Sequence, residues 1–136
     1  MAKNIQVNLN VDQNLRVKIR DAEFQQVFLN LINNAAQSIS SLEAVKGHIQ
    51  IEATQNEDKA QISISDNGRG VPKEQQLGLF ELLNTTKETG MGLGLWLCKH
   101  IITRYEGSIY YKDAVGRGAK FVIELPLFNK NKMSHS

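Results

Sequence analysis

The feature that most constrains the fold is a long stretch of helically spaced apolar residues in the first third of the chain. Asp21 stands where a helix cap is expected, just before this stretch begins. Spacing of three and four residues places apolar side chains on one side of a helix, so the stretch predicts an amphipathic helix of several turns. The spaced residues are Phe24, Val27, Phe28, Leu31, Ile32, Ala35, Ile39 and Leu42.

Apolar and polar residues alternate in six shorter runs, which predict half-buried strands. A second helix is expected over residues 93–102, through Leu93, Trp96, Leu97, His100 and Ile101, and weaker helical character over residues 73–83. We therefore expect an α+β fold, a two-layer sandwich in which a mixed sheet of about five to six strands packs against helices. The domain is predicted to span residues 1–128, followed by a polar, disordered tail at 129–136. The six runs are residues 5–9, 15–19, 48–53, 60–65, 108–112 and 120–125, with the pair 48–53 and 60–65 expected to form an antiparallel hairpin.

Length and charge exclude several classes of function. The chain has 136 residues and a net charge of +2, with charges of both signs interspersed. This predicts one domain with a single core, and it argues against nucleic acid as a partner. The single cysteine, Cys98, cannot form an internal disulfide and is predicted to be a small core residue. No run approaches the roughly 20 apolar residues of a membrane span, so we expect a cytoplasmic domain without direct membrane contact, whose longer parent could still be anchored.

The run from Ser65 to Pro72 places a carboxylate, Asp66, at the end of an alternating segment and then two glycines, Gly68 and Gly70. In isolation, such a sequence indicates a turn after a strand. In the alternative interpretation, the carboxylate accepts a hydrogen bond from the edge of a ligand, and the glycines let the backbone turn sharply beside it.

Two asparagines border the apolar stripe of the first helix. At about 100° per residue, Asn34 lies about 20° from Val27, and Asn30 lies about 40° further round on the same face. A solvated helix edge would explain an isolated pair. The functional alternative is a magnesium site in which an amide oxygen supplies one ligand and phosphates and water supply the others.

Glycines open the second long helix in the run Gly90-Met91-Gly92-Leu93-Gly94-Leu95. Glycines just ahead of a helix let backbone N–H groups approach an anion, although a flexible hinge is an equal alternative. The spacing matches neither the dinucleotide fingerprint nor a Walker motif. Thr85, Thr86 and Lys87 precede the run, and Lys87 could reach a terminal phosphate or be merely solvated. Gly116 and Gly118 are interpreted as a hairpin turn without a ligand role.

The order of these motifs resembles the catalytic, ATP-binding domain of bacterial sensor histidine kinases, over roughly residues 5–127. In that family's terms they are the asparagine box, the first glycine box, the phenylalanine box and the second glycine box. The corresponding runs are residues 26–35, Asp66 to Pro72, Leu79-Phe80-Glu81, Thr85-Thr86-Lys87 and Gly90 to Leu95. The sequence departs from the family's Phe-Phe-Thr-Thr-Lys run at Leu83-Asn84, and the segment between Pro72 and Gly90 is short.

The resemblance implies a Bergerat-type fold that binds ATP and magnesium. Asp66 would accept a hydrogen bond from the adenine amino group, and Gly68 and Gly70 would let the chain pass close to the base. Asn34 would hold magnesium, and Asn30 would support the metal and phosphate side. The remaining implied nucleotide contacts are Phe80 as lid anchor, Thr85, Thr86, Lys87 at the terminal phosphate, and Gly90, Gly92, Leu93 and Gly94 around the phosphates.

The implied function is transfer of the terminal phosphoryl group to a histidine on a separate dimerisation and phosphoacceptor domain, with a response regulator as an indirect partner. Related ATPases and serine kinases carry a glutamate general base at the position of Asn30, and an amide cannot take a proton. A serine kinase or ATPase of the same superfamily, or a nucleotide-dependent docking module, remains the alternative. None of His48, His100 and His135 lies in a phosphoacceptor motif, so we expect one domain of a longer kinase.

Overall fold

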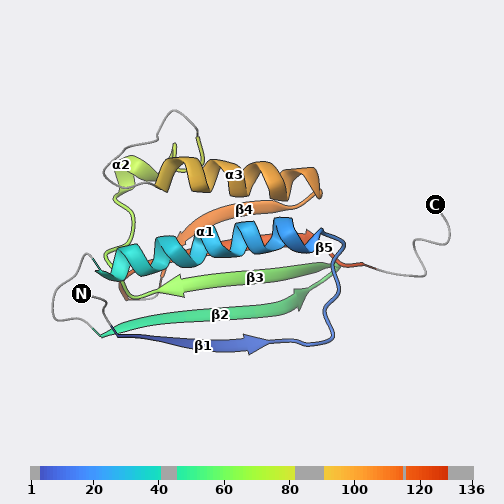
Figure 1. Cartoon of the computed structure of the whole chain (residues 1–136), viewed down its shortest axis with the longest axis horizontal. Helices are drawn as coiled ribbons and strands as arrows, with labels where there is room; N and C mark the ends of the chain where they lie inside the picture. Colours follow the sequence, from blue (N-terminus) through green and yellow to red (C-terminus); the bar gives the residue numbers. More distant parts are fainter. Residues whose placement is uncertain (1–3, 41–45, 82–90, 115, 129–136) are drawn as a thin grey trace.

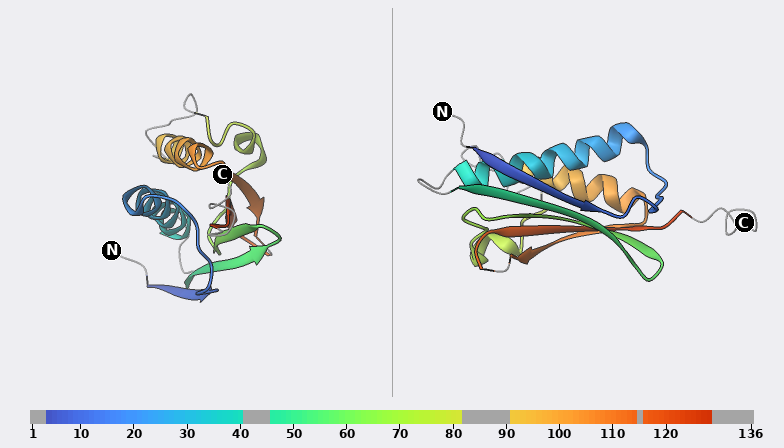
Figure 2. Two further views of the ribbon diagram at one scale, coloured as in Figure 1. Left: turned by 90° about the vertical axis from the view of Figure 1, so that its right-hand side faces the viewer. Right: turned by 90° about the horizontal axis from the view of Figure 1, so that it is seen from below.

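The computed structural model describes residues 4–40, 46–81, 91–114 and 116–128. Within these ranges, five strands and three helices form two layers, with the two long helices on one face of the sheet (Figures 1 and 2). The elements are β1 (Ile5–Val11), α1 (Asp21–Ser40), β2 (Gly47–Asn56), β3 (Lys59–Asp66), α2 (Lys73–Gln76), α3 (Met91–Arg104), β4 (Ser108–Asp113) and β5 (Ala119–Pro126). The predicted α+β sandwich with a mixed sheet is confirmed.

The sheet has the strand order β1-β2-β3-β5-β4. β1 and β2 are parallel and are joined by α1 as a crossover, whereas the other neighbouring strands are antiparallel. The two predicted hairpins, β2–β3 and β4–β5, are confirmed. This topology brings the end of β3 next to the start of β5, where the register pairs Ser65 with Lys120.

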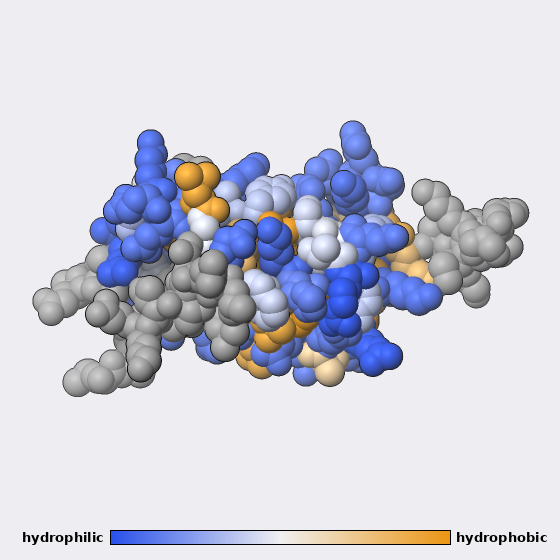
Figure 3. Space-filling view, turned by 90° about the horizontal axis from the view of Figure 1, so that it is seen from above, coloured by the Kyte–Doolittle hydropathy of each residue, from blue (hydrophilic) through white to orange (hydrophobic). Residues whose placement is uncertain are grey.

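The apolar stripe of α1 faces the sheet as its spacing predicts. Val27, Leu31 and Ile39 are fully buried and belong to one core cluster with the inward-facing residues of β2, β3 and β5. Leu42 lies outside the described residues. Seen from above in the orientation of Figure 1, the surface is mostly hydrophilic with small hydrophobic areas (Figure 3).

The strand predicted at residues 15–19 is wrong. In its place the structure has an isolated bridge from Val17 to Leu127, and the backbone N–H of Phe128 donates to the carbonyl of Arg16. The segment crosses the end of the sheet on the way to α1 instead of adding a sixth strand. Its alternation arises because Leu15, Val17 and Ile19 pack against the core while their neighbours stay exposed.

The face predicted for the second long helix is only partly correct. The most buried residues of α3 are Leu95, Cys98, Ile101 and Ile102, of which only Ile101 was among those predicted. Trp96 and His100 instead stack on each other at a ring-centroid distance of 5.2 Å, with His100 exposed. The prediction failed because α3 is apolar on more than one side, so the spacing alone does not decide which side meets α1 and the sheet.

The cysteine is a core residue, as predicted. Cys98 is fully buried, and its Sγ lies 3.7 Å from the carbonyl oxygen of Val27 on α1. Burial raises the pKa of the Cys98 thiol to about 11, so the thiolate is scarce near neutral pH. Among the residues that the structure describes, no helix is long and apolar enough to cross a bilayer.

Candidate nucleotide site

Asp66 is the last residue of β3, and its side chain is buried, with 6% of its surface exposed. Its Oδ1 accepts hydrogen bonds from the backbone N–H of Gly68 at 2.8 Å and of Ala119 at 3.4 Å. The hydroxyl of Ser38, near the end of α1, lies close enough to the same carboxyl to favour its charged form. Three separate segments of the chain therefore fix this carboxylate in one orientation.

Burial is the main influence on the ionisation of Asp66. It raises the pKa of the carboxyl, because the charged form loses solvation. The hydrogen bonds from Gly68, Ala119 and Ser38 favour the charged form and oppose that shift. A buried carboxylate held by fixed donors can serve as an oriented acceptor for an N–H group of a ligand.

The turn after Asp66 is tightly packed between α1 and the β4–β5 hairpin. A Cβ on Gly68 would lie 2.6 Å from the carbonyl carbon of Ser38, and Gly70 has a φ of +75°. The glycines thus allow close approach of protein segments to each other. Their predicted contact with a base stays a prediction.

Gly118 is a positioning residue that sequence analysis did not identify. Its φ is +111°, and a Cβ there would collide with the backbone carbonyl of Asp66. Gly116 in the same turn has nothing within 4 Å of the corresponding position, although its φ is also positive, at +86°. The Gly-Arg-Gly spacing was the available signal, but only the tertiary structure distinguishes the two glycines.

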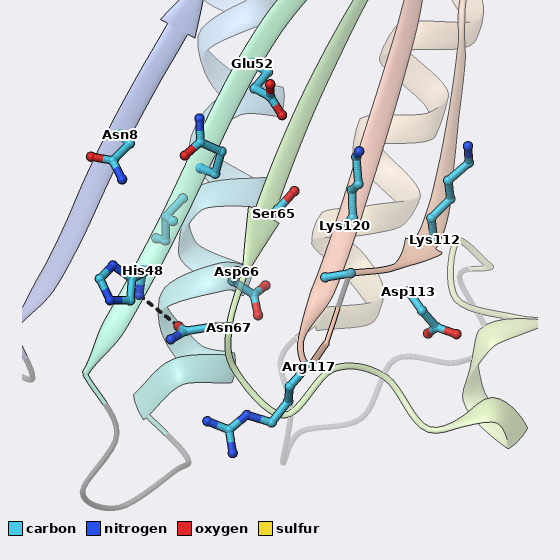
Figure 4. Close-up of a pocket in the computed structure, with 13 residues that line it drawn as sticks. Asn8, His48, Glu52, Ser65, Asp66, Asn67, Lys112, Asp113, Arg117 and Lys120 are labelled. Carbon is cyan, nitrogen blue, oxygen red and sulfur yellow. Dashed lines mark hydrogen bonds between the residues drawn. The ribbon is translucent and has the colours of Figure 1, made fainter.

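The side chain of Asn67 links the turn to the start of β2 by hydrogen bonds. Its Oδ1 accepts from the backbone N–H of His48 at 2.8 Å (Figure 4). Its Nδ2 donates to the carbonyl of Lys46, also at 2.8 Å. A hollow of about 510 Å³ adjoins Asp66 and Asn67 on the sheet face away from the helices, and most of the residues around it are of polar or charged type, such as Ser65, Lys112 and Lys120 (Figure 4). The asparagines of α1 lie on the other side of the sheet.

Three polar residues form a row along α1 at intervals of four residues, which we call the α1 row: Asn30, Asn34 and Ser38. Asn30 donates from Nδ2 to the carbonyl of Gly94 in α3 at 3.4 Å, and Ser38 contacts Asp66 at the other end of the row. Residues at this spacing share one helix face, and eight residues extend about 12 Å along the axis. Ser38 was not identified from the sequence, although its spacing from Asn34 was a signal.

Asn34 lies in the middle of the α1 row. Its side chain is buried, with 8% exposed, and its Nδ2 has no hydrogen-bond partner among the residues that the structure describes. An unpaired buried amide costs roughly 1–3 kcal/mol, so such a group indicates a position where a ligand completes the hydrogen bonding.

The second glycine run lies inside a helix instead of ahead of it. α3 begins at Met91, so Gly92, Leu93 and Gly94 belong to its first turn. The N–H groups of a first turn have no partner within the helix, so the expected anion-binding chemistry is compatible with this placement. Thr85, Thr86, Lys87 and Gly90 lie outside the described residues.

Phe80 is partly buried and makes an edge-to-face contact with Phe121 of β5, at a centroid distance of 6.1 Å and an interplanar angle of 90°. The neighbouring Leu79 is more deeply buried, with 7% exposed. Two residues, Leu79 and Phe80, therefore anchor this segment, where Phe80 alone was expected. The predicted helix over residues 73–83 is confirmed only for the four residues of α2.

Residues 20–129 match the protein family described as "Histidine kinase-, DNA gyrase B-, and HSP90-like ATPase". The chain belongs to this family. It is 36% identical to sporulation kinase D of Bacillus subtilis over 126 residues, which cover 91% of this chain and 24% of that protein. It is 41% identical to the signal transduction histidine-protein kinase AtoS of Escherichia coli over 104 residues, covering 76% of this chain and 16% of AtoS. The chain thus spans a quarter or less of the length of these two relatives.

The fold is also that of histidine kinase catalytic domains. The nucleotide-free catalytic domain of the histidine kinase ThkA superimposes with a TM-score of 0.75 and 31% sequence identity, covering 90% of this chain and 80% of that one. The resemblance inferred from the motifs is therefore confirmed: the chain is a catalytic, ATP-binding domain of the sensor histidine kinase type.

Replacement of Gly118 by alanine tests its positioning role. We expect Gly118→Ala to lower the free energy of unfolding by about 2–5 kcal/mol, because a left-handed backbone and a collision with Asp66 act together. Gly116→Ala is the matched control and should cost about 1–2 kcal/mol, since it has the backbone term alone. Urea denaturation measures both, and equal losses would contradict the close contact with Asp66.

The raised pKa of Asp66 predicts a pH-dependent effect of Asp66→Asn. Because the pKa is higher in the folded state than the roughly 3.9 of an unfolded aspartate, the ionised carboxylate destabilises the fold above the folded-state pKa. Asp66→Asn should therefore be more stable than the wild type at pH 7. The advantage should decline as the pH falls through the folded-state pKa and vanish below about 3.9. Urea midpoints across this range measure it, and a constant difference would refute the assignment.

Proposed function

We propose that this domain binds magnesium-ATP and transfers the terminal phosphoryl group to a histidine on a separate dimerisation and phosphoacceptor domain. A response regulator would be an indirect partner of the domain. The observation that carries the proposal is the α1 row. One end of the row holds the buried carboxylate of Asp66, the other contacts the first turn of α3 at Gly94, and the unpaired amide of Asn34 lies between them.

The Asp66 end suits adenine. The exocyclic amino group of adenine is an N–H donor. A fixed carboxylate suits it as an acceptor, because hydrogen bonds to a charged oxygen are stronger than bonds between neutral groups. The close packing of Gly68 and Gly118 around Asp66 restricts its movement, which supports recognition of one base edge. Gly70 belongs to the same turn, and Phe80 would anchor the segment that covers the nucleotide.

The part of the α1 row from Asn34 to Asn30 suits phosphates and magnesium. Within the described residues, no group of three or more histidine, cysteine, aspartate or glutamate side chains could hold a metal ion. A metal would therefore depend on amide and phosphate oxygens, which magnesium accepts together with water. We assign Asn34 as its protein ligand, with Asn30 in support, and bound magnesium would neutralise phosphate charge during transfer.

The first turn of α3 would complete the phosphate site. Backbone N–H groups of Gly92, Leu93 and Gly94 would hold phosphate oxygens beside the positive end of the helix dipole. Gly90, Thr85 and Thr86 would extend this contact, and Lys87 would meet the terminal phosphate. These last four residues lie outside the described ranges, so their assignment rests on the motif order.

Asn30 favours histidine as the acceptor. Its amide is a donor to the carbonyl of Gly94, and an amide cannot remove a proton from water or from a serine hydroxyl. A neutral imidazole needs no such base: its nitrogen lone pair forms the new N–P bond while the bond from phosphorus to the ADP oxygen breaks. Positioning and charge neutralisation would then supply most of the catalysis.

Nucleotide binding should depend on both parts of the α1 row. We expect Asp66→Asn to weaken binding of a fluorescent ATP analogue about tenfold or more, by loss of a charged acceptor. Asn34→Ala should weaken it by a similar factor in magnesium and by much less in EDTA. Asn33→Ala changes an exposed asparagine of the same helix and is the matched control. Unchanged affinity in both site variants would refute the assignment.

The acceptor is tested separately. Incubated alone with radiolabelled ATP, the chain should form no phosphohistidine, because neither described histidine is placed as an acceptor: His100 stacks on Trp96, and His48 is the second residue of β2. With an added histidine-bearing dimerisation domain, acid-labile label should appear on that domain and be lost with Asp66→Asn. Acid-labile label on this chain alone, or acid-stable label on the partner, would contradict histidine transfer.

A further inference from the structure

Both polar groups of the Val71 backbone are paired with side chains. The N–H of Val71 donates to the hydroxyl of Tyr111 on β4 at 3.3 Å, and its carbonyl accepts from Nε2 of Gln76 on α2 at 2.9 Å. Within the described ranges, neither group has a backbone partner. We call these two hydrogen bonds the Val71 clamp. Two side chains, and not secondary structure, therefore fix the backbone at this point.

Val71 lies between the two parts of the proposed nucleotide site that this segment joins. It follows the turn that begins at Asp66, and it precedes α2 and Phe80. The carboxylate end of the turn is fixed by the hydrogen bonds described above. Arg69 and Gly70 make no hydrogen bond to another described residue, and Gly70 has a left-handed φ of +75° that leaves its backbone free to change. The clamp is therefore where the chain is next fixed.

The side chain of Tyr111 is itself held on two sides. Its hydroxyl donates to Oδ1 of Asp113 at 3.0 Å, and its ring contacts Phe121 of β5 edge-on at a centroid distance of 5.5 Å. Burial raises the pKa of the Tyr111 hydroxyl, and the charges of Asp113 and Asp66 add to this shift. The hydroxyl thus stays protonated near neutral pH, where it accepts from Val71 while it donates to Asp113.

Phe121 connects the clamp to the anchor at Phe80. It is 3% exposed, and the rings of Tyr111 and Phe80 both contact it. A phenylalanine on β4 would make the same ring contact, so packing alone does not require the hydroxyl of Tyr111. The hydroxyl has a separate effect, which is to fix the end of the turn relative to β4.

We propose that Tyr111 and Gln76 are positioning residues for adenine recognition. By holding Val71, they keep the turn in the conformation that orients the Asp66 carboxylate toward the amino group of the base. This inference rests on the nucleotide binding proposed above and adds the residues that maintain its selectivity. Neither side chain needs to touch the nucleotide, because both act through the backbone of the turn.

Amide exchange tests the clamp without nucleotide. Tyr111→Phe removes the acceptor for the Val71 N–H but retains the ring contact with Phe121, so hydrogen exchange of the Val71 amide, followed by NMR, should accelerate about fivefold. Tyr110→Phe is the matched control, because it removes a hydroxyl beside Glu124 on the other face of β4. It should leave exchange at Val71 unchanged. Equal exchange in Tyr111→Phe and the wild type would refute the clamp.

Base selectivity tests the positioning role. In competition with a fluorescent ATP analogue, Tyr111→Phe and Gln76→Ala should each weaken ATP binding about three- to tenfold. Purine riboside triphosphate lacks the 6-amino group, so its affinity should change by less than about twofold. The loss for ATP should be the same in magnesium and in EDTA, unlike that of Asn34→Ala. Gln75→Ala, at the exposed neighbour of Gln76, is the control.

The outcomes separate the positioning role from nucleotide binding itself. An equal loss for ATP and purine riboside triphosphate would overturn the positioning role, since a general loosening of the domain affects both. Unchanged ATP affinity in Tyr111→Phe and Gln76→Ala would overturn it as well, with binding by the wild type intact. A wild type that binds no ATP would refute the proposed function together with the adenine role, and exchange at Val71 would still decide whether the clamp exists.

Discussion

The geometry of the candidate site depends on the burial of one carboxylate. Removing an ionised group from water carries a penalty of several kcal/mol unless fixed donors compensate it. For Asp66, the compensation comes from three segments that are distant in sequence: the end of α1, the turn after β3 and the start of β5. These segments must lie in contact at one point, so the glycines at 68 and 118, where a Cβ would collide with a neighbouring segment, are a consequence of this single constraint.

α1 fixes the position of the other site residues relative to Asp66. As the crossover between the parallel strands β1 and β2, it is bound to the sheet along its apolar stripe, so its polar residues have little freedom to rotate. The α1 row uses the regular four-residue spacing to relate Asp66 to the first turn of α3 across about 12 Å. A rigid helix therefore sets the distance between the two ends of the proposed nucleotide site.

Local periodicity predicted the elements well, and long-range contacts account for what it missed. The helix through Leu31, the two hairpins and the position of Asp66 at a strand end all follow from patterns within short windows. The contact of Gly118 with Asp66 joins residues 52 positions apart, and nothing in either local sequence specifies it. The alternation at residues 15–19 reflects the burial of alternate side chains, and the segment forms only an isolated bridge instead of a strand. The buried side of α3 was decided by its neighbours, since apolar residues lie on several of its sides.

The candidate site reduces the stability of the unliganded fold. Burial of the Asp66 carboxylate and the unpaired amide of Asn34 both reduce the stability of the unliganded fold. A domain with such a site needs compensation from apolar burial elsewhere. In this fold the core cluster supplies that burial, with Val27, Leu31 and Ile39 of α1 packed against the sheet.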